Sequence, residues 1–253
     1  MVTKSESFKM KKQLLCLFSL VAAAFFLGSC TSTRYIADSL KTYAPTDIAL
    51  IEPYTDMSYI QKGNQAEYDD SLSWLAHETL LDCLEDNAST FPYGEILYLN
   101  DKDTWRNIAL DVDYLLEQCR GCARSTIAKY PIPESLATFM ADNGLPHAML
   151  LWHEGMMRSP KNYANQVAVD AAVTLGFMAL SVLNTVLLHS PSYTYYYGTP
   201  VKETSQFTVA VANADEGTLS FYNQVKAEQC PNDRMSDFEL LHRLFKKYPK
   251  QQL

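Results

Sequence analysis

The stretch of sequence that decides the fold is residues 207–222, which read FTVAVANADEGTLSFY. Large apolar side chains alternate with small ones as far as Val211, and the alternation resumes at Leu219 after the polar residues 215–217. A period of two places alternate side chains on one face of a strand. A short polar segment with glycine between two such runs is typical of a hairpin turn. The sequence therefore predicts an antiparallel β-hairpin here.

Three apolar runs upstream of the hairpin predict further strands. They are residues 48–51, which Pro53 closes, residues 96–99, and residues 148–152. Short apolar runs bounded by turn residues are consistent with buried strands.

Apolar residues at helical spacing predict helices between these strands. One is expected at residues 67–85, one follows a cap at Asp101 or Asp103, and a short one is expected at 134–141. Near the carboxyl terminus, Ser236-Asp237-Phe238-Glu239 forms a capping box that predicts the start of a final helix.

The order of these elements predicts an α/β protein. Strands alternate with helices, which favours a small mixed sheet with flanking helices, and the closing hairpin adds antiparallel pairing. Residues 46–253 are expected to form a single domain, with an apolar helix inserted at about 165–190.

The amino terminus has the parts of a secretory signal. Lysines within 9–12 precede an apolar stretch at 14–27, and Leu27-Gly28-Ser29-Cys30 follows. The apolar stretch is shorter than a permanent helix across ~30 Å of hydrocarbon requires. Residues 27–30 resemble the lipobox of bacterial lipoproteins. An ordinary signal peptide with a chance cysteine is the alternative.

The lipobox resemblance implies an anchor. Residues 1–29 would be removed, and Cys30 would carry a diacylglycerol and a palmitate, with residues 30–45 as a tether. Each buried CH₂ contributes ~0.8 kcal/mol, so three acyl chains make the attachment effectively permanent. Thr31 follows the cysteine where Asp would favour the inner membrane. We therefore expect a lipid-anchored envelope protein in the outer membrane, facing the periplasm.

The charge of the mature chain excludes one class of partner. Removing residues 1–29 takes away four lysines and one glutamate, which leaves 17 basic and 28 acidic residues and a net charge of −11. Such a surface repels phosphate backbones, so nucleic acid is not expected to bind.

The layout also resembles a small α/β fold of envelope proteins. The likeness is carried by the strand at 48–53, by Trp152-His153-Glu154-Gly155, and by residues 209–222. It is similar to the amino-terminal domain of TolB, to the curli secretion lipoprotein CsgG, to outer-membrane activators of penicillin-binding proteins, and to further envelope lipoproteins. The resemblance implies binding and assembly and carries no catalytic residues.

Residues 171–188 form an uncharged stretch long enough to be a transmembrane candidate. On a helix, Thr174, Ser181 and Asn184 or Thr185 share one stripe, so the other faces are apolar. Three interpretations stay open: a helix in the core, a helix that contacts the membrane or partner copies, and a second span. The expected contact residues are Leu175, Phe177, Met178, Leu180, Val182, Leu183, Val186, Leu187, Tyr193, Tyr195, Tyr196 and Tyr197.

Four cysteines remain after export and lipidation: Cys83, Cys119, Cys122 and Cys230. An even number in an oxidising compartment is consistent with disulfides. Cys119 and Cys122 have the spacing of a redox motif, but Cys119 lies at the end of a predicted helix, where the helix dipole does not lower a thiol pKa.

Catalytic motifs are absent from the sequence. His77-Glu78 and His153-Glu154 lack the second histidine of a metalloprotease motif, and we expect both pairs to be solvated or edge residues. No metal or cofactor is expected. The sequence thus favours a non-enzymatic binding or assembly module, with a protein partner or a homo-oligomer. The alternative is a thiol-disulfide protein that uses Cys119 and Cys122.

Overall fold

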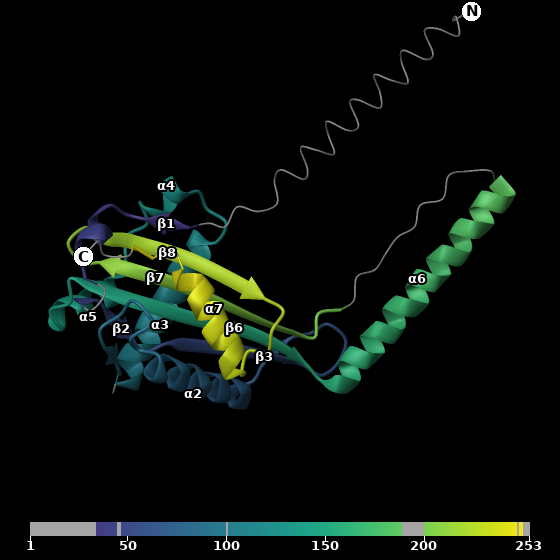
Figure 1. The fold of residues 1–253 in the computed structure, drawn as a ribbon, viewed down its shortest axis with the longest axis horizontal. Coiled ribbons are helices and arrows are strands. Elements are labelled where there is room, and N and C mark those ends of the chain that lie inside the picture. The colour runs from purple at the N-terminus through teal and green to yellow at the C-terminus, as the bar shows by residue number, and fades with distance from the viewer. Residues whose placement is uncertain (1–33, 45–46, 100, 189–199, 247, 250–253) are drawn as a thin grey trace, which may run out of the picture.

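The computed structural model describes residues 34–44, 47–99, 101–188, 200–246 and 248–249. The signal segment, Cys30 and the tyrosines at 193–197 lie outside the described residues. Within the described part, one mixed sheet is covered by helices on both faces (Figure 1). The predicted α/β class, with a mixed sheet and flanking helices, is confirmed.

The described sheet has eight strands, in which β1, β8, β7, β6, β2 and β5 are successive neighbours. The middle strand, β6, also pairs with β3, which in turn pairs with β4. The strands are β1 (Tyr35–Ile36), β2 (Ala49–Ile51), β3 (Tyr54–Ile60), β4 (Glu67–Tyr68), β5 (Ile96–Leu97), β6 (His147–Arg158), β7 (Glu203–Asn213) and β8 (Thr218–Ala227).

Helices on the two faces of the sheet enclose two separate apolar cores. Helices α2 and α7 and the 3₁₀ helix η1 bury one core, and α3 and α5 bury the other. The helices are η1 (Ser39–Thr42), α2 (Asp70–Asp86), α3 (Lys102–Cys119), α4 (Arg124–Ile127), α5 (Glu134–Asp142), α6 (Pro160–Leu188) and α7 (Arg234–Phe245).

The hairpin predicted from residues 207–222 is β7 and β8. Ala210 lies opposite Tyr222 in an antiparallel ladder, and Gly217 supplies the turn with φ 63°. That backbone conformation favours glycine because it has no Cβ. Val209 and Val211 point into the core under α2 and α7, while Ala210 points into the other core, as the alternation predicts.

Strand β6 is longer than its apolar run indicates, and β3 was not predicted. Ala148 and Met149 pair with β2, and the later residues of β6 pair with β3 from Tyr54 onward, both in parallel. The break between β2 and β3 is Glu52-Pro53. Proline has no N–H to donate to the ladder, so strand pairing is interrupted at Pro53. One side of β6 therefore pairs with two successive strands, first β2 and then β3.

Two predicted boundaries are corrected by the structure. Part of the expected tether belongs to the domain, because Tyr35 pairs with Tyr222 and Leu40 is buried in the core. The capping box at Ser236 is not the start of the last helix. The Asp233 carboxylate instead accepts a hydrogen bond from the Ser236 N–H at 2.9 Å, and α7 begins at Arg234. This start places Asp237 inside the helix, facing the core.

Gly155 lies where β6 closely approaches its neighbours. A Cβ at this position would lie 2.5 Å from the Met57 sulfur, 2.6 Å from Cβ of Pro231 and 3.0 Å from the Thr204 carbonyl oxygen. We expect Gly155→Ala to lower the free energy of unfolding by about 1–3 kcal/mol, because β6 cannot move away from strands on both sides.

Denaturant unfolding measures this effect, and Gly176→Ala is the matched control. Nothing lies within 4 Å of a Cβ added at Gly176, which is inside α6. Alanine favours a helix interior by about 1 kcal/mol over glycine, so the control should be neutral or stabilising. Equal effects of the two substitutions would contradict the packing described at Gly155.

Candidate functional site

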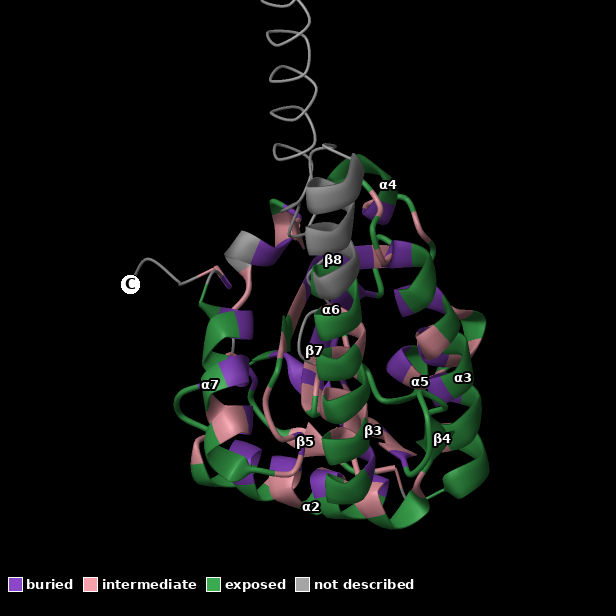
Figure 2. Ribbon diagram, turned by 90° about the vertical axis from the view of Figure 1, so that its right-hand side faces the viewer, coloured by how far each residue is buried: buried purple, intermediate pink, exposed green. Residues whose placement is uncertain are grey.

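Helix α6 leaves the domain and points away from the sheet (Figure 1). It has 29 residues, so at 1.5 Å per residue it is roughly 43 Å long. It begins directly after β6, and most of its described residues are exposed, as their colour in Figure 2 shows. Of the apolar insertion expected at about 165–190, residues 165–188 are therefore the outer part of a longer helix.

The apolar side chains of α6 are exposed over the part where they are described. Val169 is 54 %, Leu175 66 % and Met178 42 % exposed, and no side chain from 171 to 178 is buried. The interpretation of 171–188 as a core helix therefore does not hold for 171–178. Leu180, Val182, Leu183, Val186 and Leu187 lie in the part of α6 whose side chains are not described.

The topology around α6 bears on whether it could span a membrane. Within the described residues, no helix combines the length and hydropathy that crossing a bilayer requires. The chain also returns to the point where α6 begins: the Arg158 N–H donates to the Lys202 carbonyl at 2.9 Å, and β6 pairs with β7 from Met157 opposite Glu203.

Hydrogen bonds join the end of β6 and the first turn of α6 to Gly63 and Val201. The Ser159 hydroxyl accepts from the Asn162 N–H at 3.1 Å and caps the helix. Arg158 donates to the Val201 carbonyl at 2.8 Å and, together with the Asn162 amide, to the Gly63 carbonyl. The Arg158 side chain also donates to the Asn162 side-chain oxygen at 3.0 Å. These bonds fix the direction in which α6 leaves the sheet.

A cleft of about 790 Å³ opens at the break between β2 and β3. It lies beyond the carboxyl ends of the parallel strands β2 and β5, between α2 and the start of α3. The Glu52 carboxylate in this cleft accepts from the Leu99 N–H at 3.1 Å and lies 3.7 Å from Nε2 of His77. The crevice at the carboxyl ends of strands is where open α/β sheets generally bind ligands.

Aromatic rings form the walls of this cleft. Tyr54 stacks between Trp105, with ring centroids 5.4 Å apart, and Trp152, at 5.2 Å. Tyr68 from β4 and Trp74 from α2 line the cleft and are largely exposed. Burial raises the pKa of Tyr54 to about 12, so its phenol stays protonated at neutral pH.

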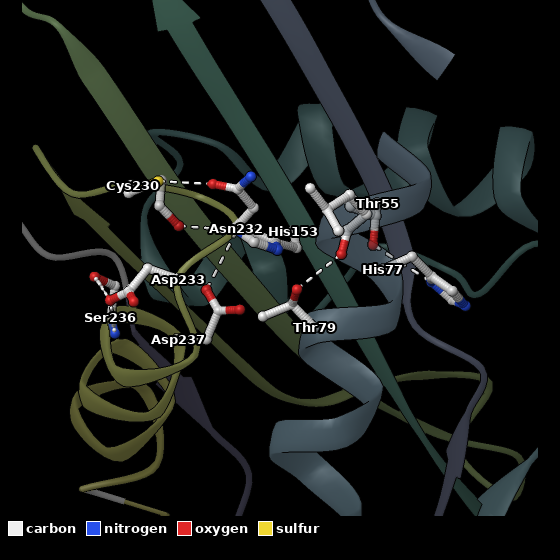
Figure 3. A network of polar contacts seen from close by, with 11 residues as sticks. Thr55, His77, Thr79, His153, Cys230, Asn232, Asp233, Ser236 and Asp237 are labelled. Atoms are coloured by element: carbon white, nitrogen blue, oxygen red, sulfur yellow. Dashed lines mark hydrogen bonds and ion pairs between the residues drawn. The ribbon is translucent and has the colours of Figure 1, made fainter. Parts of the chain in front are cut away.

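A serine, a histidine and an aspartate meet inside the core beneath α7. The Ser205 hydroxyl lies 2.9 Å from Nε2 of His153. The Asp237 carboxylate lies 3.9 Å from the same nitrogen, and Figure 3 shows His153 and Asp237 facing each other. All three side chains are buried, and the Phe207 ring stacks on His153 at 4.0 Å. The expectation that His153 is a solvated or edge residue is wrong, because β6 continues beneath α7.

This arrangement is not a catalytic triad. In a triad, one histidine nitrogen faces the serine and the other faces the aspartate. Here both groups face Nε2, and Nδ1 of His153 has no hydrogen-bond partner. Burial lowers the pKa of His153 to about 3 and raises that of Asp237 to about 8, so both side chains are neutral at moderate pH. The cost of burying charge explains both directions.

The four described cysteines are free thiols in the structure. Cys83 lies in the core under α2 and α7, and Cys119 lies in the core on the other face of the sheet, so these two cannot pair. Burial raises the pKa of Cys119 to about 12 and that of Cys83 to about 11, and it also raises the pKa of Cys230. Raised thiol pKa values oppose the nucleophilic chemistry of a redox centre.

Comparison with known proteins gives distant structural likenesses. No protein-family model matches the sequence, and no curated protein matches it. The chain is similar to the PelC dodecamer from Paraburkholderia phytofirmans, with 7 % identity, a TM-score of 0.35, and coverage of 88 % of this chain and 99 % of that one. It is also similar to the LpoB carboxy-terminal domain from Salmonella enterica, with 9 % identity, a TM-score of 0.27, and coverage of 76 % and 88 %. Likenesses this distant carry no conclusion about the function of this chain.

The site residues expected from the sequence are partly brought together. Leu175, Phe177 and Met178 lie on the exposed part of α6. The cleft was not predicted, because Glu52, Trp74 and Trp105 are far apart in the sequence. No local motif joins them, so only the fold reveals that they share a site.

Proposed function

We propose that this chain is a lipid-anchored protein of the bacterial cell envelope that assembles with further copies of itself through α6. It acts by binding and not by catalysis. The observation that carries the proposal is the exposure of apolar side chains on α6, among them Leu175 and Met178. Contiguous exposed apolar surface on a soluble domain marks an interaction site.

Further copies of the same chain are the partners that can best cover the apolar faces of α6. The segment 171–188 is apolar on most sides, and a helix of this kind is stable only when it is surrounded. A groove on one partner covers a single face, whereas several copies of α6 cover one another. Thr174 and Ser181 are seven residues apart, the spacing that lets polar side chains meet across helices in a bundle. Anchoring through Cys30 would also confine the copies to one surface and raise their effective concentration.

The pairing of β6 with β7 argues against α6 as a membrane-spanning helix. If α6 crossed a bilayer once, β7 would begin on the far side, away from the strand with which it pairs. A return through hydrocarbon would expose backbone groups without hydrogen-bond partners, which costs several kcal/mol each. The lipid on Cys30 supplies the anchor without such a span.

Two features support binding over catalysis. The Ser205, His153 and Asp237 side chains are buried and wrongly arranged for nucleophilic attack. Burial raises the pKa of the Cys119 thiol, which argues against the thiol-disulfide alternative that uses Cys119 and Cys122.

Replacing the anchor cysteine tests the proposal. We expect wild-type protein to stay with membranes after salt extraction, and Cys30→Ala protein to appear in the soluble fraction as an oligomer. Cys16→Ala is the matched control, because Cys16 lies in the segment that export removes, and membrane attachment should be unchanged. A Cys30→Ala protein that is monomeric, or that stays in the membrane, would contradict the proposal.

A further inference from the structure

The cleft at the break between β2 and β3 has the features of a binding site, and its position is independent of α6. It lies at the first residues of β3, whereas α6 leaves near the end of the neighbouring strand β6. Strand β3 has seven residues, which separates the two features by about 20 Å. Its volume of about 790 Å³ lies in the usual range of small-ligand pockets.

The aromatic walls offer flat apolar surfaces held in fixed planes. Tyr54 lies between Trp105 and Trp152 with interplanar angles of 29° and 27°, so the orientation of the Trp105 ring is set by stacking. Trp74 reaches the cleft from α2 and is 64 % exposed. Burying such rings against a ligand contributes strongly to binding.

The polar side chains of the cleft balance one another in charge. Two acidic residues, Glu52 and Asp70, line it together with two basic residues, Lys102 and Arg106. These four lining residues therefore add no net formal charge that would favour an anion or a cation. The same side chains, with His77, supply both acceptors and donors of hydrogen bonds around the rings.

We infer that this cleft binds a neutral saccharide. The C–H faces of a pyranose ring are apolar and pack flat against indole or phenol rings, while its hydroxyls each donate and accept a hydrogen bond. Aromatic walls with a rim of mixed donors and acceptors meet both requirements. An ionic ligand would gain from only half of the charged groups and meet repulsion from the rest.

Binding of defined hexasaccharides to the full-length chain tests the inference. Protein is purified in a detergent without a sugar headgroup and titrated with cellohexaose, chitohexaose or maltohexaose, with tryptophan fluorescence and calorimetry as readouts. We expect saturable binding of at least one of the three. Trp74→Ala is expected to weaken it at least tenfold; since Trp74 is 64 % exposed, its removal should not disturb folding.

Tyr114→Ala is the matched control, because Tyr114 is an exposed aromatic residue on α3 outside the cleft, and it should leave the affinity unchanged. Binding of none of the three sugars would overturn the inference, and so would equal losses in the Trp74 and Tyr114 variants. Binding of an unfolded carboxymethylated protein in their place, lost with Trp74→Ala, would assign the cleft to peptides and also overturn it.

Discussion

The free energy of unfolding of the Asp237→Asn variant is expected to rise relative to that of wild type as the pH increases. The expected gain is about 1.4 kcal/mol for each pH unit between about pH 4 and 8. Asp237 is fully buried, and neither of its carboxylate oxygens has a hydrogen-bond partner. Burial, aided by the nearby Asp233 carboxylate, raises its pKa from 3.8 to about 8. The folded state therefore holds a proton that the unfolded state has released, and stability falls as the pH rises through this window.

The buried His153 has the opposite effect on the pH dependence of stability. Burial lowers its pKa from 6.5 to about 3, so the unfolded state binds the extra proton and stability rises with pH over that range. In wild type, the contributions of Asp237 and His153 cancel between pH 3.8 and 6.5. Above pH 6.5 only the Asp237 contribution remains, and it lowers the free energy of unfolding of wild type by about 2 kcal/mol between pH 6.5 and 8.

Chemical denaturation at a series of pH values measures this difference. The difference in stability between the variant and wild type should widen steadily from about pH 4 to 8, because His153 contributes equally to both proteins. Asp142→Asn, which replaces an exposed carboxylate at the end of α5, is the control and should follow the wild-type profile. Parallel profiles for wild type and Asp237→Asn would contradict a buried, protonated Asp237.

Leu175→Glu/Met178→Glu is expected to turn the oligomer of Cys30→Ala protein into a monomer. Both side chains are exposed and three residues apart on α6, so the glutamates fall on the same side of the helix. Burying two carboxylates among apolar helices costs several kcal/mol each, which exceeds what a small helical contact supplies. The domain itself should be unaffected, because neither side chain is buried in it.

Light scattering gives the molar mass of each variant. Leu110→Glu/Tyr114→Glu is the matched control, because both residues are exposed on α3 and are four residues apart. It adds the same charge without touching α6 and should remain oligomeric. If both double variants keep the oligomer mass of Cys30→Ala protein, or if both become monomers, α6 is not the surface that joins the copies.

Local signals predicted the elements that depend on neighbouring residues. The hairpin followed from alternation around Gly217. The start of α3 was expected at a cap by Asp101 or Asp103, and it is the Asp101 carboxylate that accepts from the Asp103 and Thr104 N–H groups. Strand β3 was missed because its sequence mixes Asp56 and Ser58 with apolar residues, and its partner β6 lies far along the chain.

The candidate sites were harder to predict, since their properties depend on the tertiary fold. Apolar composition alone does not distinguish a core helix from a projecting one, so the exposure of Leu175 could not be read from 171–188. The burial of His153 arises because α7 covers the second half of β6. Tyr54 meets Trp105 and Trp152 only once β3 has paired with β6.

Photo-cross-linking from α6 in intact envelopes tests the central claim most directly. Benzoylphenylalanine replaces Leu175 in the full-length lipidated chain, and the same residue in place of the exposed Met235 on α7 is the control. Self-assembly through α6 predicts a ladder of cross-linked products that contain only this chain from position 175 and none from position 235. Cross-links from position 175 to lipid alone, or to a different protein alone, would contradict it.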